Sequence, residues 1–392
     1  MIDYPSKMNN IIELSFIKSL TQSLKFNNGL LQVIIGSRQV GKTTSVLHYF
    51  EQHHKNHFNY YSADEVFNSS ANWIMEIWGK AKSEKKFLII DEIQKCENWS
   101  VVIKKLWDEE KRKRTLFPCI LLGSSSLEIQ KGLTESLTGR FEIHNAHHWN
   151  FAESKKGYQL SFENFLKYGG YPGSYQFINN EDSWAKFVKQ SIVLTVIEKD
   201  ILQYQTVKSP SLFKQAFEII MSYPAQEISY TKLLGQLQDK GNTELVKYYM
   251  SLYEGAFLIK VLQKYSGKKI VTKSSTPKIL PLAPCLYFLE IRDRYTSEEK
   301  GRVFELLVGA QLVRTGEELF YWREKNDEVD FVLKKGKKLF AIEVKSGRKK
   351  SPKGLMKFNE KFPDSKSVII SLEDYEAFER APISFLEQRA LN

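Results

Sequence analysis

The segment that most constrains this chain is LQVIIGSRQVGKTTSVLHYF, residues 31–50. It reads as an apolar strand, a glycine-containing turn and an amphipathic helix that begins near Lys42. The turn matches the pattern G-x-x-x-x-G-K-[ST]. Glycines at such a turn let backbone N–H groups curve around phosphate oxygens, and the positive end of the helix dipole points at the same place. The segment therefore predicts an α/β domain with a phosphate-binding loop.

The loop also predicts which groups contact a nucleotide. We expect Lys42 to reach the β and γ phosphates of ATP and the Thr43 hydroxyl to bind Mg²⁺. A glycine turn that only packs is the alternative, but the lysine, the threonine and the flanking elements together argue against it. The predicted ATP-binding residues are Gly36, Ser37, Arg38, Gln39, Val40, Gly41, Lys42, Thr43, Thr44 and Asp91.

A second apolar segment, FLIIDE at residues 87–92, predicts a buried parallel strand that ends in two carboxylates. Ligands of such sheets bind at the carboxyl ends of the strands. We therefore expect Asp91 to bind the Mg²⁺ of the nucleotide and Glu92 to orient or deprotonate the attacking water. A helix cap is the other use of paired acids at a strand end.

A third strand, in PCILLGSSS, leads into small polar residues at positions 123–126. Ser124, with Ser125 as second choice, is expected to contact the γ-phosphate or the attacking water. Arg140, in SLTGRFEI, is a candidate arginine finger or sensor, and a surface or structural arginine is the alternative. The candidate catalytic residues are Glu92, Lys42, Arg140 and Ser124.

These motifs, together with FENFLKYGGYPGSY at residues 162–175, resemble in order and spacing the bacterial and archaeal AAA+ family ATPases whose C-terminal half is a domain of unassigned role. The resemblance covers nearly the whole chain. It implies an AAA+ P-loop NTPase with a parallel sheet and a helical lid, in which Ser124 takes the role called sensor 1. The segment HNAHHWNFAE departs from the Pro-Leu-rich turn usual in that family.

Residues 206–275 have the pattern of a winged-helix unit. Three helices are expected between residues 213 and 253, followed by a hairpin that turns at Gly267. The third helix of such a unit can enter a DNA major groove, although winged helices also contact proteins. The candidate DNA contacts are Lys247, Tyr248, Tyr249, Lys268 and Lys269.

The last hundred residues predict a helix, a strand and a hairpin that turns at Gly336. Glu305 lies on the helix and Asp330 on the hairpin, while Glu343 and Lys345 share a strand face because they are two residues apart. This constellation resembles the PD-(D/E)xK nuclease superfamily, which implies a restriction-endonuclease-like α/β domain. In such a site Asp330 and Glu343 would hold Mg²⁺ or Mn²⁺, with Glu305 completing or orienting the shell, and Lys345 would position or activate the attacking water. A surface ion pair, or a decayed site used for binding, is the alternative.

Composition bounds the remaining possibilities. The three cysteines lack metal or disulfide spacing, and no targeting segment or membrane-length apolar run is present, so a soluble cytoplasmic protein without a membrane partner is expected. The formal net charge of +11 is spread along the chain. Such a charge permits contact with nucleic acid but is also typical of a merely basic surface.

Four parts are therefore expected: an AAA+ ATPase core at 1–150, a helical lid and linker at 151–205, the winged-helix unit at 206–275 and the nuclease-like domain at 276–392. The predicted function is Mg²⁺-dependent ATP hydrolysis that drives or regulates the C-terminal module on DNA. Because AAA+ modules commonly form rings, a homo-oligomer is expected. One alternative is an ATP-regulated protein-interaction switch with a catalytically silent nuclease-like domain, and another is a nucleotide-binding scaffold without turnover.

Overall fold

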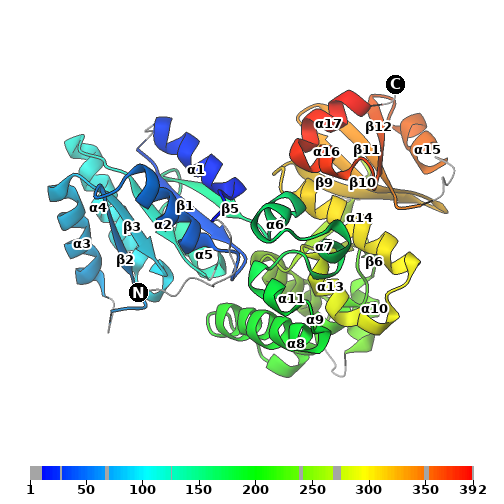
Figure 1. Cartoon of the computed structure of the whole chain (residues 1–392), viewed down its shortest axis with the longest axis horizontal. Helices are drawn as coiled ribbons and strands as arrows, with labels where there is room; N and C mark the ends of the chain where they lie inside the picture. Colours follow the sequence, from blue (N-terminus) through cyan, green and yellow to red (C-terminus); the bar gives the residue numbers. More distant parts are fainter. Residues whose placement is uncertain are drawn as a thin grey trace. The chain divides into compact units, whose positions relative to one another are not determined.

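The computed structural model describes residues 11–26, 29–66, 70–124, 126–237, 242–267, 275–347 and 353–390. The chain forms two compact units (Figure 1), and each is described by itself. Unit 1 comprises Met1–His148 and Gln190–Thr206, and unit 2 comprises Trp149–Lys189 and Val207–Asn392.

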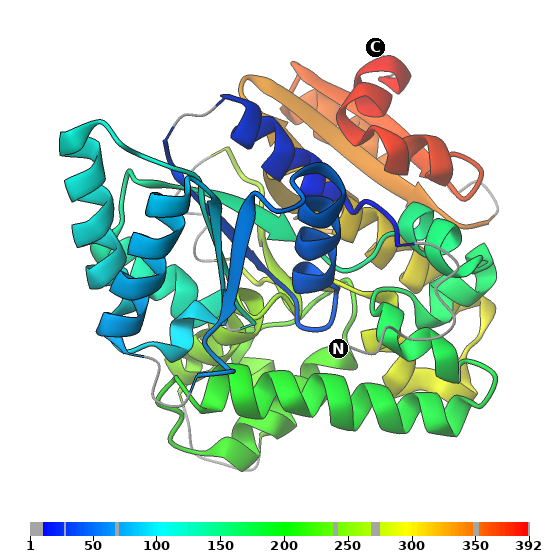
Figure 2. The same cartoon turned by 60° about the vertical axis from the view of Figure 1, so that its left-hand side comes forward.

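Unit 1 is built on a five-stranded sheet with the order β2-β3-β4-β1-β5, in which every neighbouring pair is parallel. Helices cover both faces of this sheet (Figure 2), which is why its central strands are continuous apolar runs. The strands are β1 (Leu31–Gly36), β2 (Phe58–Ser62), β3 (Phe87–Asp91), β4 (Cys119–Leu122) and β5 (Phe141–Ala146). The helices are α1 (Ser15–Phe26), α2 (Lys42–His53), α3 (Ala71–Glu84), η1 (Ile93–Lys95), α4 (Trp99–Lys113) and α5 (Ser126–Ser136), and a later segment adds the π-helix η4 (Val196–Leu202).

The strand order brings the predicted nucleotide residues to one edge. In a parallel sheet all carboxyl ends lie at the same edge, and β4 lies between β1 and β3. The loop that follows β1, the serine that follows β4 and the acids at the end of β3 therefore meet there. The predicted strands and their order along the chain are confirmed.

Unit 2 contains a seven-stranded sheet with the order β12-β11-β10-β9-β7-β8-β6. Its strands are β6 (Gln226–Glu227), β7 (Ile259–Lys264), β8 (Lys278–Pro281), β9 (Glu318–Glu324), β10 (Asp327–Lys335), β11 (Lys338–Lys345) and β12 (Ser365–Ser371). Its helices are α6 (Phe151–Tyr158), α7 (Phe162–Tyr168), η2 (Pro172–Phe177), α8 (Glu181–Phe187), α9 (Pro210–Met221), α10 (Tyr230–Gln236), α11 (Thr243–Gly255), α13 (Pro284–Ile291), η5 (Arg292–Arg294), α14 (Ser297–Val313), α15 (Lys353–Lys361), α16 (Tyr375–Arg380) and α17 (Pro382–Arg389), and the π-helix η3 (Val188–Val193) spans the boundary with unit 1.

The three helices expected in the middle of the chain are α9, α10 and α11. Side-chain caps fix the starts of the last two, because Ser229 accepts a hydrogen bond from the Lys232 amide and Asn242 accepts one from the Leu245 amide. Strands β7 and β8 then pair antiparallel. The predicted contacts Lys268 and Lys269 lie outside the described residues. None of the described helices is both long and apolar enough to cross a membrane.

The division into units differs from the predicted boundaries at residues 151–205. The first part of this segment belongs to unit 2, where the buried Glu379 carboxylate accepts hydrogen bonds from the amides of Phe151 (2.8 Å) and Ala152 (2.9 Å) at the start of α6. The second part belongs to unit 1, where Asp200 pairs with Arg38. Sequence pattern alone showed a helical stretch but not these distant partners.

Candidate functional site

The phosphate loop joins β1 to α2 at residues 36–41. Its two glycines have positive φ angles, 152° at Gly36 and 86° at Gly41. A Cβ atom at Gly36 would lie 2.0 Å from the carbonyl oxygen of Ala146 at the end of β5. A side chain is therefore excluded at Gly36 both by its φ angle and by the neighbouring strand.

Lys42 begins α2 and is buried in the loop. Its Nζ donates to the carbonyl oxygens of Gly36 (3.1 Å) and Ser37 (2.8 Å). Burial lowers the pKa of Lys42 to about 8, although nearby carboxylates partly oppose this effect. A buried ammonium held only by neutral carbonyls favours an anion beside it, which is what a phosphate group supplies.

Thr43 and Asp91 lie side by side where the sequence predicted a magnesium site. Thr43 Oγ1 donates to Asp91 Oδ2 at 2.6 Å, and the hydroxyl of Tyr60 on β2 donates to the same oxygen at 3.1 Å. Burial raises the pKa of Asp91 above its ordinary value. A hydroxyl and a carboxylate at this separation are hard oxygen donors of the kind Mg²⁺ prefers, so these residues fit a nucleotide-bound magnesium ion.

Glu92 directly follows β3 and has a positive φ of 51°. For a residue with a side chain this conformation is strained, and such strain is concentrated at functional sites. The Oε2 atom of Glu92 accepts hydrogen bonds from Gln94 Nε2 (2.5 Å) and Ser124 Oγ (2.8 Å). Two side chains thus fix one carboxylate oxygen at the carboxyl edge of the sheet. Ser125, the second choice beside Ser124, lies outside the described residues.

The remaining predicted loop residues shape the loop itself. Gln39 has a φ of 58° and its Nε2 donates to the carbonyl of Ser191 at 3.0 Å. Val40 is 1% exposed and anchors the loop in the core. Thr44 is half-buried in the first turn of α2.

Arg140 is placed away from the phosphate loop of its own chain. Strand β5 begins at Phe141, just after Arg140, and ends at Ala146, which pairs with Gly36 at the start of the loop. At about 3.3 Å per residue the two ends of β5 are roughly 20 Å apart. The Arg140 guanidinium donates instead to both oxygens of Asp108, at 2.8 and 3.2 Å. A contact with the γ-phosphate in its own chain is therefore excluded.

The predicted C-terminal residues lie on one helix and one hairpin of unit 2. Glu305 is in α14, Asp330 is in β10, and Glu343 and Lys345 are in β11. The two strands pair antiparallel, as predicted, and Asp330 Oδ2 accepts a hydrogen bond from the amide of Val344 at 2.8 Å. Asp330 is thus tied to the neighbouring strand between Glu343 and Lys345.

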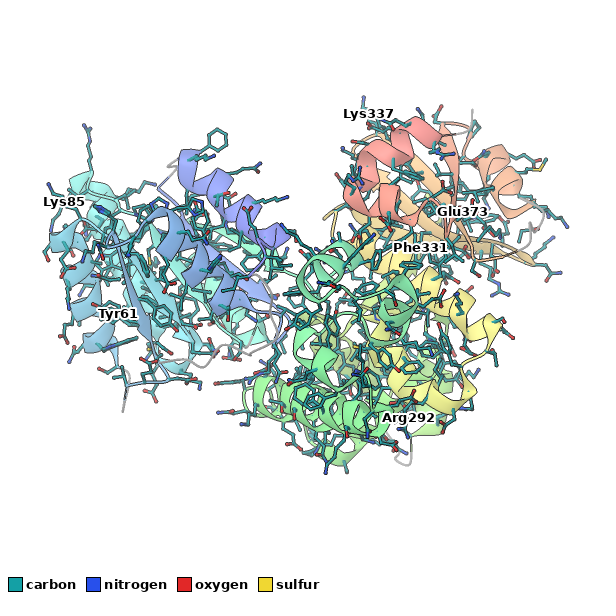
Figure 3. The ribbon with its side chains drawn as sticks, in the orientation of Figure 1. Tyr61, Lys85, Arg292, Phe331, Lys337 and Glu373 are labelled. Carbon is teal, nitrogen blue, oxygen red and sulfur yellow. The ribbon has the colours of Figure 1, made fainter. Side chains whose placement is uncertain are left out.

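Glu305 has a partner that the sequence did not indicate. The Nζ of Lys278, on β8, lies 2.5 Å from Glu305 Oε1 and donates to the carbonyl oxygen of Asp330 at 3.1 Å. The same ammonium lies 4.9 Å from the ring centre of the buried Phe331, which is labelled in Figure 3. The lysine side chain is 8% exposed and the glutamate side chain 22%, so this ion pair is largely buried.

Glu343 and Lys345 form a second ion pair. Burial raises the pKa of Glu343 to about 7, and the neighbouring Asp330 carboxylate adds to this effect. Among the described residues, the buried Oε2 atom of Glu343 finds no hydrogen-bond partner. No group of three or more histidine, cysteine, aspartate or glutamate residues in the described part of the chain is arranged to hold a metal ion. Because Lys278 binds Glu305, this glutamate is not free to complete the predicted shell around Asp330 and Glu343.

Comparison with known families divides the chain into three matched stretches. Residues 28–155 match the AAA domain family. Unit 1, which contains the phosphate loop, is called the AAA domain for its similarity to this family. Residues 159–286 and 300–385 match two domains of unknown function, DUF8612 and DUF4143.

Two relatives match over most of the chain. An uncharacterized protein of Methanocaldococcus jannaschii is 28% identical over 330 residues, covering 77% of this chain and 72% of that protein. One of Haemophilus influenzae is 21% identical over 369 residues, covering 83% and 85%. Among solved structures, a Walker-type ATPase of Pyrococcus abyssi has a TM-score of 0.52 at 13% identity and covers 73% of this chain and 98% of its own. This last likeness shows the fold of a P-loop ATPase.

Four residues of the AAA domain site were not singled out from the sequence as site residues. They contact predicted residues by side chain: Tyr60 with Asp91, Gln94 with Glu92, Ser126 with Gly36, and Asp200 with Arg38. Ser126 could have been found from the strand-end rule that selected Ser124, because both residues follow β4. The other contacts depend on side-chain positions or on a segment remote in sequence.

Proposed function

We propose that the AAA domain hydrolyses ATP by in-line attack of a water molecule that Glu92 orients. The observation that supports this most is the placement of Glu92 beside the Thr43 and Asp91 pair at the loop edge of the sheet. When bound, Mg²⁺ would neutralise charge on the phosphate oxygens, with Thr43 and Asp91 as its protein ligands. Lys42 would supply the buried positive charge for the β and γ phosphates.

The direct test is the Glu92→Gln variant. Glutamine keeps the size of the side chain but cannot accept a proton from water, so the turnover rate is expected to fall by at least about 100-fold while ATP binding persists. Steady-state hydrolysis and binding of a fluorescent ATP analogue measure the two effects separately. Glu97→Gln, at an exposed glutamate of the same region, is the matched control and should hydrolyse ATP normally. Full turnover by Glu92→Gln would overturn the assignment.

We also propose that Arg140 acts in the site of a neighbouring copy, as an arginine finger in a homo-oligomer. Its place at the amino edge of the sheet supports this role, because it leaves the guanidinium remote from its own loop. Arg140→Ala and Lys42→Ala should each be inactive, and mixing them should restore part of the turnover. In the mixture the Lys42→Ala chain supplies Arg140 to an intact loop. A mixture as inactive as its components would contradict action in trans.

For the C-terminal half we propose a module regulated by the AAA domain. The order α9, β6, α10, α11, β7, β8, with β8 paired to both β6 and β7, supports a winged-helix unit. Its predicted groove contacts are less available than the sequence suggested. Tyr249 is 1% exposed, and Lys247 pairs with Glu244. Of the described contacts, Tyr248 is an exposed one.

Two functions compete for the last domain. The order of α14, β9, β10, β11, α15 and β12 supports the nuclease-like fold, and the buried, unpaired Oε2 atom of Glu343 supports a ligand at its site. The buried pair of Lys278 with Glu305 favours the second function, a switch whose nuclease-like domain binds a partner without cleaving DNA. An ammonium at that carboxylate removes a metal ligand and repels a divalent cation nearby.

Incubation of the protein with linear and circular DNA and Mg²⁺ or Mn²⁺ separates the two functions. Asp330→Ala is the active-site control, because Asp330 lies between the two ion pairs. The switch function predicts no metal-dependent cleavage by either protein. Cleavage that requires both the metal and Asp330 would establish the nuclease function instead.

A further inference from the structure

Arg38 of the phosphate loop binds an aspartate that lies 162 residues further along the chain. Its Nε donates to Asp200 Oδ2 at 2.9 Å and its Nη2 donates to Asp200 Oδ1 at 2.8 Å. These two parallel bonds fix the plane of the guanidinium as well as its position. Asp200 is 4% exposed and belongs to the π-helix η4. Single-turn π-helical segments occur frequently at functional sites.

The guanidinium extends this contact to the catalytic edge of the sheet. Arg38 Nη2 also donates to Ser124 Oγ at 3.1 Å, and Ser124 Oγ donates to Glu92 Oε2 at 2.8 Å. The direction of these bonds follows from the donors available. Arginine can only donate, so Ser124 Oγ accepts from Arg38 and its single hydroxyl proton is donated to Glu92. A continuous chain of hydrogen bonds therefore runs from Asp200 through Arg38 and Ser124 to Glu92.

We propose that Asp200 is a positioning residue for ATP hydrolysis, which acts on the orientation of Glu92 through Arg38 and Ser124. The proposal rests on the proposed function, in which Glu92 orients the attacking water. Without the carboxylate of Asp200 the Arg38 guanidinium can rotate, so the Ser124 hydroxyl loses a fixed hydrogen-bond donor. The orientation of the Glu92 carboxylate is then less well fixed. A displacement of this kind affects the reacting geometry more than the binding of ATP.

The segment that carries Asp200 does not depend on this pair alone. Gln205 Nε2 donates to Glu128 Oε1 at 2.9 Å, and the Ser191 carbonyl accepts from Gln39 at 3.0 Å. Residues 190–206 are therefore attached to unit 1 at several points. Loss of the Asp200 carboxylate should leave the segment in place, so a catalytic defect can be distinguished from detachment. In the sequence, residues of unit 2 precede and follow this segment, so Asp200 lies in a stretch of unit 1 that connects two parts of unit 2 along the chain.

Asp200→Asn in the full chain is the principal test. We expect its kcat for ATP to fall by about tenfold to 100-fold, while the Kd of a fluorescent ATP analogue changes by less than about threefold. Asp200→Glu, which restores the charge on a longer side chain, should recover part of the rate. The double variant Arg38→Ala with Asp200→Asn should be no slower than Arg38→Ala alone, because both changes interrupt the same chain of bonds.

Gln205→Ala is the matched control, since it removes another contact of the same segment and should leave kcat within about twofold of the native rate. Equal losses in Asp200→Asn and Gln205→Ala would show a merely structural role and overturn the proposal. So would an unchanged kcat in Asp200→Asn beside an inactive Glu92→Gln. If Glu92→Gln also turns over ATP normally, the proposed function itself has failed. Circular dichroism verifies the fold of each variant, and Asp200→Glu carries the test if Asp200→Asn does not fold.

Discussion

Each candidate site contains a buried lysine, and the two ammonium groups have different hydrogen-bond partners. In the AAA domain Lys42 donates to two backbone carbonyls of the phosphate loop. In unit 2 Lys278 forms an ion pair with Glu305. Burial lowers the pKa of Lys42 to about 8. Burial acts in the same direction on Lys278, but the carboxylates of Glu305 and Asp330 outweigh it and raise the pKa.

Because of this difference, the Lys42 site favours the binding of an anion, whereas the charge of Lys278 is already compensated by a carboxylate. A buried cation among neutral dipoles is stabilised by any anion that enters, so Lys42 favours a phosphate group. A buried cation paired with a carboxylate gains little from a further anion, and the carboxylate is no longer available to a metal ion. The same residue type at the same degree of burial thus supports a ligand site in one unit and opposes a metal site in the other.

Loss of the unpaired lysine should have the largest effect on function. In Lys42→Ala the phosphates lose their buried counter-charge, so kcat/KM for ATP is expected to fall by about 1,000-fold. A coupled assay of phosphate release measures the rate. Lys278→Met, which removes the paired lysine, should leave ATP hydrolysis by the folded protein near the native rate. Comparable losses of ATP hydrolysis in Lys42→Ala and Lys278→Met would contradict the claim that only Lys42 contributes to hydrolysis.

Loss of the paired lysine should have the larger effect on stability. Lys278→Met leaves Glu305 buried without its counter-ion, and we expect the free energy of unfolding of unit 2 to fall by about 3 kcal/mol. The partner substitution should reverse this, so Lys278→Met with Glu305→Leu is expected within about 1 kcal/mol of the native protein. Urea unfolding followed by tryptophan fluorescence and circular dichroism measures these changes.

Two controls sharpen this test. Lys334→Met removes an exposed ion pair with Glu318 in the same sheet and should change the unfolding free energy by less than about 0.5 kcal/mol. Lys42→Met removes a buried charge that has no carboxylate bonded to it, so it should not destabilise unit 1. A loss in Lys42→Met as large as that in Lys278→Met would mean that the two lysines contribute alike.

Sequence patterns predicted the parts of these sites that are local in the chain. The phosphate loop and the acids at the end of β3 follow from a short motif and from the rule for parallel strands, and the structure has them at one edge of the sheet. The hairpin of β10 and β11 follows from alternation and from Gly336 at its turn. In both cases the chemistry and the local conformation depend on neighbouring residues.

Residues that come from distant segments were not predictable in this way. Lys278 stands in a short apolar strand where nothing marks it as the partner of a glutamate 27 residues later. Asp200 is an ordinary acidic residue of a helical stretch until the chain folds back on the loop. The motif around Arg140 predicted an arginine finger or sensor without indicating whose site it serves, although a position just before a parallel strand indicates the amino edge of the sheet. The missing information was the pairing of segments rather than their secondary structure.

The smallest expected effect concerns pH. Lys42 has a pKa of about 8 in the free protein. The negative charge of a bound triphosphate raises this pKa, so above pH 8 the binding of ATP is accompanied by protonation of Lys42. Affinity must then decrease as pH rises, by about fivefold between pH 8 and pH 9. Titration with a non-hydrolysed ATP analogue measures the affinity, and calorimetry in buffers of different ionisation enthalpy measures the proton. Lys42→Arg remains charged throughout and should bind with an affinity independent of pH in this range. Equal pH dependence in both proteins would show that Lys42 is already fully protonated without a ligand, as Lys278 is expected to be.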